Sequence, residues 1–327
     1  MIKKITIVGG SGFVGTRLAN RFIKNNINFN ILDICVEKNS NSYGNVEDIS
    51  SLSSLKDSSV IINLAAMHRD DVRPISRYDD VNVGGAINIC EAARKFNITK
   101  IVFTSSVAIY GFAPLGTDEG GKPNYFNDYG RTKYEAELIY KAWLEEDPKN
   151  RTLVIIRPTV IFGEGNRGNV FNLLNQINNK KFLMIGNGTN YKSMAYVENV
   201  AAFIEHSLNF KEGIHTYNYI DKPDFNMNDL IKEIRKKLFN KDNVGFRVPL
   251  FFGLLVGYLA DFLAVILRKS LPISSIRVKK FISNSMFSSS IEKIEFTPPV
   301  TLKEGLQRTL TYEFLEDNLN KKTFYSE

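Results

Sequence analysis

Three glycines close behind an apolar run constrain the fold of this chain more than any other feature. Gly9, Gly12 and Gly15 follow the run at 5–8, and Asp33 ends the next apolar run, at 29–32. Gly9 permits a tight turn, Gly12 lets the backbone approach a phosphate, and Gly15 lets a helix pack closely on a strand. The N–H groups at such a helix N-terminus bind anions. The pattern predicts a strand, a turn, a helix and a second strand built around a dinucleotide pyrophosphate.

Asp33 indicates which dinucleotide is bound. An acid about 20 residues after the glycines is placed to accept hydrogen bonds from both hydroxyls of an adenosine ribose, and its charge repels a 2′-phosphate. This favours NAD over NADP. A glycine-rich turn alone also occurs in ordinary strand-to-helix connections, but strand, turn, helix, strand and acid in this order favour the cofactor site.

The composition is that of a globular protein without a disulfide framework. Of the 327 residues, 43% are hydrophobic, which is enough for an ample core. Cys35 and Cys90 are the only cysteines, and the first strand begins too early to leave room for a signal peptide, so we expect a cytoplasmic protein. The formal charge of +7 comes from scattered lysines, which suits an anionic small-molecule substrate and not nucleic acid. His68, His206 and His215 show no ligand spacing, so no metal is expected.

Short β-rich runs alternate with helical stretches along the first half of the chain, and one more such run follows later. After the first two strands, further strands are expected at 60–64, 101–104, 153–156 and 216–220, with helices at 85–96 and 129–144. This alternation predicts an α/β fold, a Rossmann-type doubly wound parallel sheet with helices on both faces. Regular alternation stops after Pro158. We therefore expect an NAD-binding domain at 1–160, to which a later strand near 214–222 returns, and a smaller, mostly helical, partly interleaved substrate-binding region at 161–327.

Candidate catalytic residues follow the fourth predicted strand. Ser105 and Ser106 stand at its end, and Tyr129 and Lys133 lie four residues apart on a predicted helix, so both face one side. A cation beside a phenol favours the phenolate, which makes Tyr129 a usable base, and Ser106 would bind the same substrate oxygen. Serines also cap turns, and one Tyr-x-x-x-Lys is expected by chance at this composition, so the ordered combination carries the prediction.

These residues give the chain a resemblance to the extended short-chain dehydrogenase/reductase family, in its NAD-dependent nucleotide-sugar epimerase and dehydratase branch. The resemblance covers 1–220 well and the remainder loosely. The glycine pattern has Val8 where threonine is usual, and Asn45 stands where aspartate is commoner near the adenine. The resemblance implies a catalytic set of Ser106, Tyr129 and Lys133. It implies cofactor contacts at Gly9, Gly12, Phe13, Val14, Gly15, Asp33, Asn45, Val46, Leu64, Ala65, Ala66, Asn82, Ser105, Tyr129, Lys133, Pro158 and Thr159.

The resemblance also implies a nucleoside-diphosphate sugar as substrate. Lys192 stands where the family often binds the diphosphate, and Ser106, Asn166, Arg167 and Asn169 are further candidates for substrate contact, although a glycine-rich turn explains the last three nearly as well. Similar dehydratases carry an Asp-Glu pair where this chain has Val107 and Ala108, so dehydration is disfavoured.

The expected reaction is therefore 4-epimerisation of a UDP-hexose or UDP-N-acetylhexosamine through a 4-keto intermediate. A 4-ketoreductase that uses NADH or NADPH on a UDP-4-keto-6-deoxy sugar is the first alternative, since it needs the same three residues. A non-catalytic NAD-binding protein is another, because a fold does not determine a function. A homodimer is common in the family, but no residue demonstrates one.

An apolar stretch at 250–267 leaves one further alternative open. It approaches transmembrane length, with Arg247 before it and Arg268 and Lys269 after it. A membrane-associated hydroxysteroid dehydrogenase-like enzyme, or an enzyme in peripheral contact with a membrane, fits this pattern. Asp261 within the stretch favours instead a buried helix of the C-terminal region or a subunit interface, because lipid penalises a charge.

Overall fold

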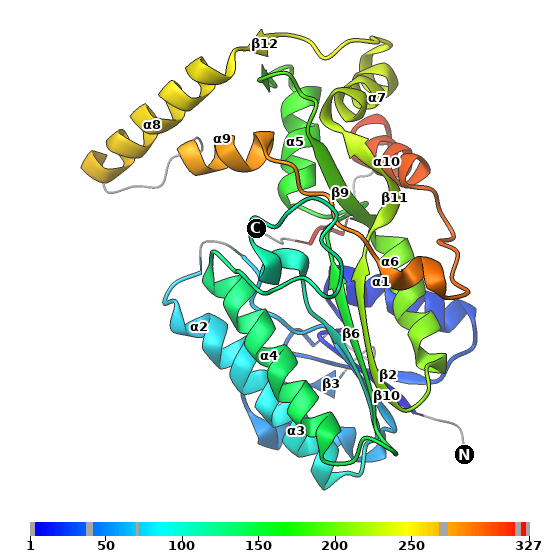
Figure 1. Ribbon diagram of the computed structural model, residues 1–327. Coiled ribbons are helices and arrows are strands. Elements are labelled where there is room, and N and C mark those ends of the chain that lie inside the picture. Colours follow the sequence, from blue (N-terminus) through cyan, green and yellow to red (C-terminus); the bar gives the residue numbers. More distant parts are fainter. Residues whose placement is uncertain (1–3, 37–41, 70–71, 268–273, 318–321, 325–327) are drawn as a thin grey trace.

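The computed structural model describes residues 4–36, 42–69, 72–267, 274–317 and 322–324 (Figure 1). Its largest sheet is parallel throughout, in the order β10-β6-β5-β4-β1-β2-β3. The strands are β1 (Ile5–Val8), β2 (Phe29–Asp33), β3 (Ser42–Tyr43), β4 (Val60–Asn63), β5 (Lys100–Thr104), β6 (Thr152–Pro158) and β10 (Gly213–Tyr219). The central strands β1, β4 and β6 are buried along their whole length because helices cover both of their faces.

Two pairs of helices cover the sheet. Helices α1 (Phe13–Lys24) and α6 (Val197–His206) pack on one face, and α3 (Gly85–Lys95) and α4 (Asp128–Glu145) pack on the other. The predicted doubly wound fold is confirmed. The predicted strands and helices are present, with ends shifted by a few residues. Strand order reverses between β1 and β4, so a crevice opens at the carboxyl ends of these neighbours, where α/β proteins bind ligands.

A second body of structure stands above those carboxyl ends (Figure 1). It contains a three-stranded sheet of β11 (Asp221–Asn226), β9 (Tyr191–Tyr196) and β7 (Val160–Phe162), and a two-stranded pair of β12 (Arg247–Val248) and β8 (Met184–Ile185). Helices α5 (Asn169–Asn178), α7 (Met227–Phe239) and α10 (Leu302–Leu310) enclose a core with this three-stranded sheet. Between its strands the chain returns to the main sheet as β10. The division into two domains near residue 160 stays a prediction.

Several short helical segments connect the longer elements. They are α2 (Ser76–Tyr78), η1 (Ile49–Asp57), η2 (Asp79–Gly84), η3 (Val107–Tyr110), η4 (Ser207–Asn209), η5 (Ser290–Lys293) and η6 (Thr311–Leu315).

Helix α8 (Leu250–Leu267) corrects one expectation from the sequence. It extends away from the body, and α9 (Ser275–Ile282) returns beside it (Figure 1). Only 11% of its residues are buried, so the prediction of a buried helix is wrong. Within the described part of the chain it is the helix that is long and apolar enough to cross a membrane, by length and composition. The flanking Arg268 and Lys269 lie outside the described residues.

Candidate functional site

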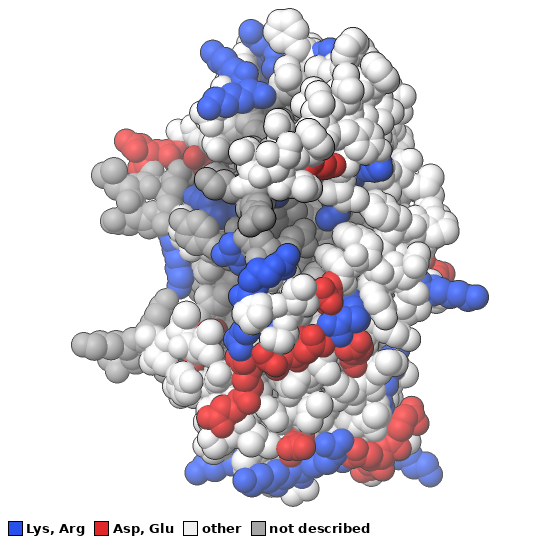
Figure 2. All heavy atoms as spheres, turned by 90° about the vertical axis from the view of Figure 1, so that its left-hand side faces the viewer, with Lys and Arg blue, Asp and Glu red and all other residues white. Residues whose placement is uncertain are grey.

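A cleft of about 880 Å³ lies at the carboxyl ends of the strands, between the main sheet and the second body. Figure 2 shows basic side chains around the hollow between the two halves and a band of acidic side chains below it. The cleft brings together most of the predicted site residues, namely Gly9, Gly12, Phe13, Val14, Gly15, Asp33, Asn45, Val46, Leu64, Ala65, Ala66, Ser105, Ser106, Tyr129, Lys133, Pro158, Thr159, Asn166 and Asn169. Asn82, Arg167 and Lys192 are not part of its lining.

The glycine turn forms a cradle that larger residues would fill. Gly9 has φ +76°, and a Cβ there would lie 2.6 Å from the Ala65 backbone nitrogen. A Cβ on Gly15 would lie 2.5 Å from Gly10 Cα. Gly12 precedes the first turn of α1, which has neither a side-chain cap nor an acidic residue. An exposed helix N-terminus of this kind fits the pyrophosphate of a dinucleotide.

Asp33 is held in place at the end of β2. Its two carboxylate oxygens accept hydrogen bonds from the backbone N–H groups of Ser11 and Cys35, each at 2.9 Å. The carboxylate therefore joins the glycine turn to the strand beside it and lines the cleft. These residues fit NAD, with the acid at the ribose position.

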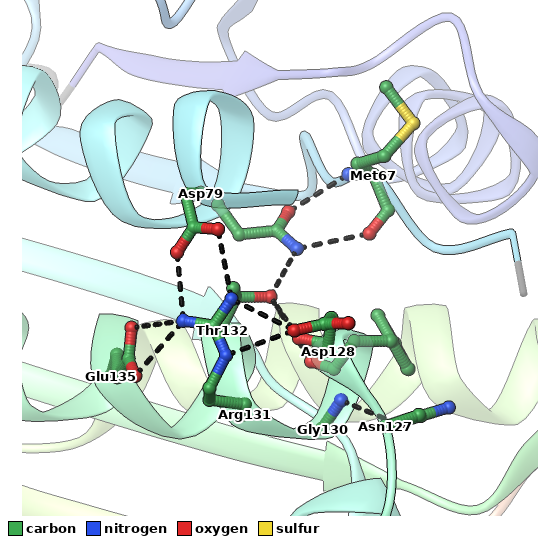
Figure 3. A network of polar contacts seen from close by, with 10 residues as sticks. Met67, Asp79, Asn127, Asp128, Gly130, Arg131, Thr132 and Glu135 are labelled. Atoms are coloured by element: carbon green, nitrogen blue, oxygen red, sulfur yellow. Dashed lines mark hydrogen bonds and ion pairs between the residues drawn. The ribbon is translucent and has the colours of Figure 1, made fainter. Parts of the chain in front are cut away.

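Asn82 acts behind the cleft lining. Its Oδ1 accepts a hydrogen bond from Met67 N at 2.9 Å, and its Nδ2 donates to Met67 O at 3.0 Å and to Thr132 Oγ1 at 2.9 Å (Figure 3). The predicted cofactor residue thus ties the segment after β4 to helix α4. Its amide positions backbone that lines the cleft, and buried polar groups of this kind need such partners.

The start of α4 is fixed by a polar network (Figure 3). Asn127 caps the helix by accepting a hydrogen bond from Gly130 N at 2.9 Å, and Arg131 pairs with Asp79 at 2.8 Å and with Asp128 and Glu135. A Cβ at Gly130 would lie 2.5 Å from Ala108 O. Gly130 therefore lets the turn that carries Tyr129 approach the segment that follows Ser106. Sequence reasoning missed this residue, although a glycine inside a predicted helix was a signal.

The three expected catalytic residues share the cleft wall. Ser106 Oγ accepts a hydrogen bond from Ala108 N at 3.1 Å and caps η3. Lys133 is only 2% exposed, and its Nζ lies 4.3 Å from the centre of the Phe103 ring. Burial lowers the pKa of Lys133 to about 7, while the carboxylate of Glu137 acts in the opposite direction. The cation therefore loses most of its hydration and interacts strongly with any negative charge in the cleft.

A buried ion pair supports this wall from behind. Arg157 donates two hydrogen bonds to Glu137, at 2.8 and 2.6 Å, and one to the Tyr110 hydroxyl at 2.6 Å. Ser105 Oγ donates to Glu137 at 2.6 Å, so its hydroxyl turns toward this pair. Glu137 was not identified from the sequence. Its position one turn after Lys133 was the available signal, but its partner Arg157 comes from another strand.

Two predicted substrate residues have other partners. Lys192 donates to the carbonyl oxygens of Lys280 and Ser283, each at 2.7 Å, and burial lowers its pKa to about 8. Arg167 pairs with Glu313 at 3.0 Å and stacks 4.0 Å over Phe171. Partly buried cations are stabilised by such partners, which direct both side chains into the second body. Asn166 does line the cleft, while its Nδ2 donates to Ile161 O at 3.1 Å.

Comparison with known proteins decides the family. The model of the NAD dependent epimerase/dehydratase family matches residues 5–219. The chain belongs to this family. It is 44% identical, over the whole of both chains, to N-acetyl-alpha-D-glucosaminyl-diphospho-ditrans,octacis-undecaprenol 4-epimerase of Escherichia coli O157:H7. It is 26% identical to UDP-glucose 4-epimerase of Vibrio cholerae, over 97% of each chain.

A solved structure shows the same fold. The UDP-glucose 4-epimerase of Thermotoga maritima, in complex with UDP-glucose, has a TM-score of 0.75 and 19% identity, over 96% of this chain and 100% of that one. The epimerase described here uses NAD, as Asp33 predicted. The predicted reaction class, NAD-dependent 4-epimerisation, is confirmed.

Proposed function

We propose that this epimerase inverts C4 of an N-acetylhexosamine whose diphosphate is joined to a polyprenyl lipid. The observation that carries the proposal is the 44% identity, over both whole chains, to the Escherichia coli enzyme whose name states such a substrate. The exposed apolar helix α8 supports it, because it gives the protein a surface suited to a membrane.

The chemistry is assigned to the cleft wall. Tyr129 takes the proton from the sugar O4 and later returns it, and Ser106 hydrogen-bonds the same oxygen. When bound in the cleft, NAD would supply reversible hydride transfer at C4, and return of the hydride to the opposite face of the 4-keto sugar would invert that carbon. Lys133 favours the phenolate of Tyr129 by its charge. Product and substrate contain the same atoms, so no external reductant is consumed.

The glycine cradle and Asp33 would hold the cofactor. The geometry described above suits the pyrophosphate at Gly9 and Gly12 and the adenosine ribose at Asp33. Asn82 serves as a positioning residue, because it holds the backbone of Met67 and does not line the cleft.

We assign the substrate diphosphate to Lys280 in place of Lys192. Among the described lining residues beyond 160, Lys280 is the cation, whereas Lys192 binds backbone carbonyls at the end of α9. Lys280 Nζ lies 4.6 Å from the ring centre of Phe126, three residues before Tyr129. A diphosphate bound there would leave its sugar near the catalytic wall.

A nucleoside diphosphate is the competing carrier of the sugar. The Vibrio cholerae relative, named for UDP-glucose, supports it. In both cases a diphosphate follows the sugar, so the same three catalytic residues serve either substrate. The two carriers differ in what lies beyond the diphosphate, which the catalytic residues do not contact.

The test compares the two carriers directly. Purified enzyme, without added cofactor, is mixed in detergent with polyprenyl-diphospho-N-acetylglucosamine or with UDP-N-acetylglucosamine, and the anomeric protons are followed by NMR. We expect conversion of the lipid-linked sugar to its C4 epimer. Conversion of the UDP sugar alone would assign the nucleotide as carrier. Reduction of a 4-keto sugar with NADH, without epimerisation, would indicate a ketoreductase.

The proposed substrate places the enzyme at a membrane. A polyprenyl chain stays in the bilayer, so an enzyme that acts on its diphospho-sugar works at the bilayer surface. We propose a cytoplasmic protein in peripheral contact with the membrane.

A further inference from the structure

Helix α8 directs its large apolar side chains into solvent. Its exposed members are Leu250, Phe251, Phe252, Leu255, Val256, Tyr258, Leu259, Phe262, Leu263, Val265, Ile266 and Leu267. Phe262 is 65% exposed and Val265 is 78% exposed. A continuous apolar surface of this kind on a soluble body marks a site of interaction.

The other side of α8 is small and polar. Gly253, Gly257 and Asp261 recur at intervals of four residues, so they share one face of the helix. A Cβ at Gly253 would lie 2.6 Å from Ile185 Cγ2, and one at Gly257 would lie 2.8 Å from Ser275 Cα. Asp261 accepts hydrogen bonds from Ser275 N at 3.3 and 3.2 Å and so holds the first turn of α9. The acid that argued against lipid therefore faces the protein.

Basic residues accompany the apolar surface. Helix α9 carries Arg277, Lys279 and Lys280 and packs along α8. Lys279 Nζ lies 5.3 Å from the centre of the Tyr258 ring, which places its charge at the edge of the apolar surface. Apolar side chains bordered by cations match the acyl region and the anionic headgroups of a phospholipid surface.

We propose that helices α8 and α9 form a hairpin that docks the enzyme on a bilayer containing anionic phospholipid, with α8 lying in the interface. At 1.5 Å per residue the 18 residues of α8 reach about 27 Å, slightly less than a hydrocarbon core. Because α9 packs along α8, a spanning arrangement would bring its three cations into hydrocarbon, which is costly. An interfacial hairpin keeps Arg277 and Lys279 at the headgroups, while Lys280 stays at the cleft.

The hairpin also joins the membrane to the cleft. Lys280, near the end of α9, lines the cleft together with Ser285 and Phe287. This part of the proposal rests on the proposed function: a lipid-linked sugar would enter the cleft while its polyprenyl chain stays in the bilayer beside α8. The order of sugar, diphosphate and lipid matches the order of Tyr129, Lys280 and α8.

Vesicle flotation of the full-length protein tests the docking without any sugar substrate. Vesicles of phosphatidylcholine with phosphatidylglycerol are expected to carry the protein upward, and vesicles of phosphatidylcholine alone to carry less. Phe262→Asp and Val265→Asp should each lower the bound fraction about tenfold, because a charge resists transfer to lipid. Lys279→Glu should weaken binding to the anionic vesicles only. Ile23→Asp on α1 is the matched control, because Ile23 is 66% exposed, as Phe262 nearly is. This variant should float like the unchanged protein.

Several results would overturn the docking proposal. One is an unchanged protein that does not float, and another is an equal loss for Ile23→Asp. A third is a dimer in solution that Phe262→Asp converts to a monomer, since a second copy would then cover α8. Retention on vesicles after an alkaline carbonate wash would contradict the interfacial position. The proposed function is tested separately, by epimerisation of the lipid-linked sugar in detergent, where no bilayer is needed. The α8 variants should keep their activity in that assay even if they no longer bind vesicles.

Discussion

At the scale of residues, the site combines a buried cation with a phenol on one turn of α4. Lys133 is almost fully buried, and Tyr129 and Ser106 line the same cleft. Proton transfer by a positioned side chain contributes about 10²- to 10⁴-fold to a rate. The proposed chemistry therefore depends on the phenol of Tyr129 more than on any other single group.

The first prediction concerns this phenol. Tyr129→Phe should lower kcat about 10³-fold, because the ring stays in place while the group that accepts the O4 proton is lost. NAD binding, followed by fluorescence titration, should stay within about threefold of the unchanged enzyme, since no cofactor charge is removed. Tyr134→Phe on the same helix is the matched control and should keep full activity. Equal rates for Tyr129→Phe and the unchanged enzyme would remove the mechanism.

The second prediction concerns Lys133 and pH. Its pKa is lowered to about 7 in the folded protein, against about 10.4 when unfolded, so the unfolded chain binds more protons between these values. The contribution of Lys133 to stability therefore rises with pH across this window, by about 2 kcal/mol from pH 7 to pH 9. The variant Lys133→Met lacks this pH-dependent contribution. We expect it to be more stable than the unchanged protein at pH 7, because it buries no ionisable amine, and we expect this difference in the free energy of unfolding to be smaller at pH 9 by about 2 kcal/mol.

Urea unfolding at both pH values, without added cofactor, measures this difference. Lys141→Met is the control on the same helix, because its side chain is partly exposed. A stability difference for Lys133→Met that does not vary with pH would show that Lys133 carries the same charge in both states.

At the scale of elements, the Glu137–Arg157 pair joins α4 to β6 directly behind the catalytic wall. Both side chains are almost fully buried, at 0% and 5% exposure. Such a pair orients the elements that carry it, and either partner left alone becomes an uncompensated buried charge.

The third prediction follows from this pair. Glu137→Gln should lower the free energy of unfolding by about 3–5 kcal/mol, because Arg157 keeps its charge in an apolar environment. Glu137→Gln combined with Arg157→Met should cost less than the two separate losses added together. Urea unfolding measures all three proteins.

An exposed ion pair supplies the comparison. Lys303 and Glu233 pair at 2.9 Å on the surface, so Lys303→Met should cost about 1 kcal/mol or less. Equal losses for Glu137→Gln and Lys303→Met would mean that water reaches Arg157.

At the scale of the whole molecule, the cleft adjoins the α8–α9 hairpin, because Lys280 of α9 is part of the cleft lining. The sheet and helix α4 carry the glycine turn and the proposed catalytic residues, and the rest of the chain adds Lys280 and the exposed helix α8. This arrangement suits the proposed action at the boundary between water and bilayer.

The fourth prediction concerns salt. Raising ionic strength should slow epimerisation of the lipid-linked sugar in anionic vesicles about three- to tenfold, because salt screens the attraction between the cations of α9 and the headgroups. The rate on a water-soluble, short-chain analogue should change little. The rate of formation of the C4 epimer is measured for both substrates at low and high salt. An equal effect of salt on the two rates would show that salt acts on binding in the cleft and not on membrane docking.

The sequence by itself determined the larger sheet and the cofactor turn. Gly9, Gly15 and Asp33 act on neighbours within the first strand-turn-helix-strand unit, and apolar alternation is a local property that predicts strands and helices. The helix spacing of Tyr129 and Lys133 likewise predicted their common face. These signals were sufficient for the fold class and for most of the cleft lining.

Only the tertiary structure decided which side chains reach the cleft and which helix faces solvent. Lys192 and Arg167 have the charge that a diphosphate needs. Lys192, however, hydrogen-bonds carbonyl oxygens at the end of α9, and Arg167 pairs with Glu313, and both partners are distant in sequence. The apolar sequence of helix α8 with its single acid predicts a core helix, yet only Gly253 and Gly257 of this helix are buried. Composition and spacing describe a segment's own chemistry, whereas burial and pairing depend on partners distant in sequence, which no local pattern specifies.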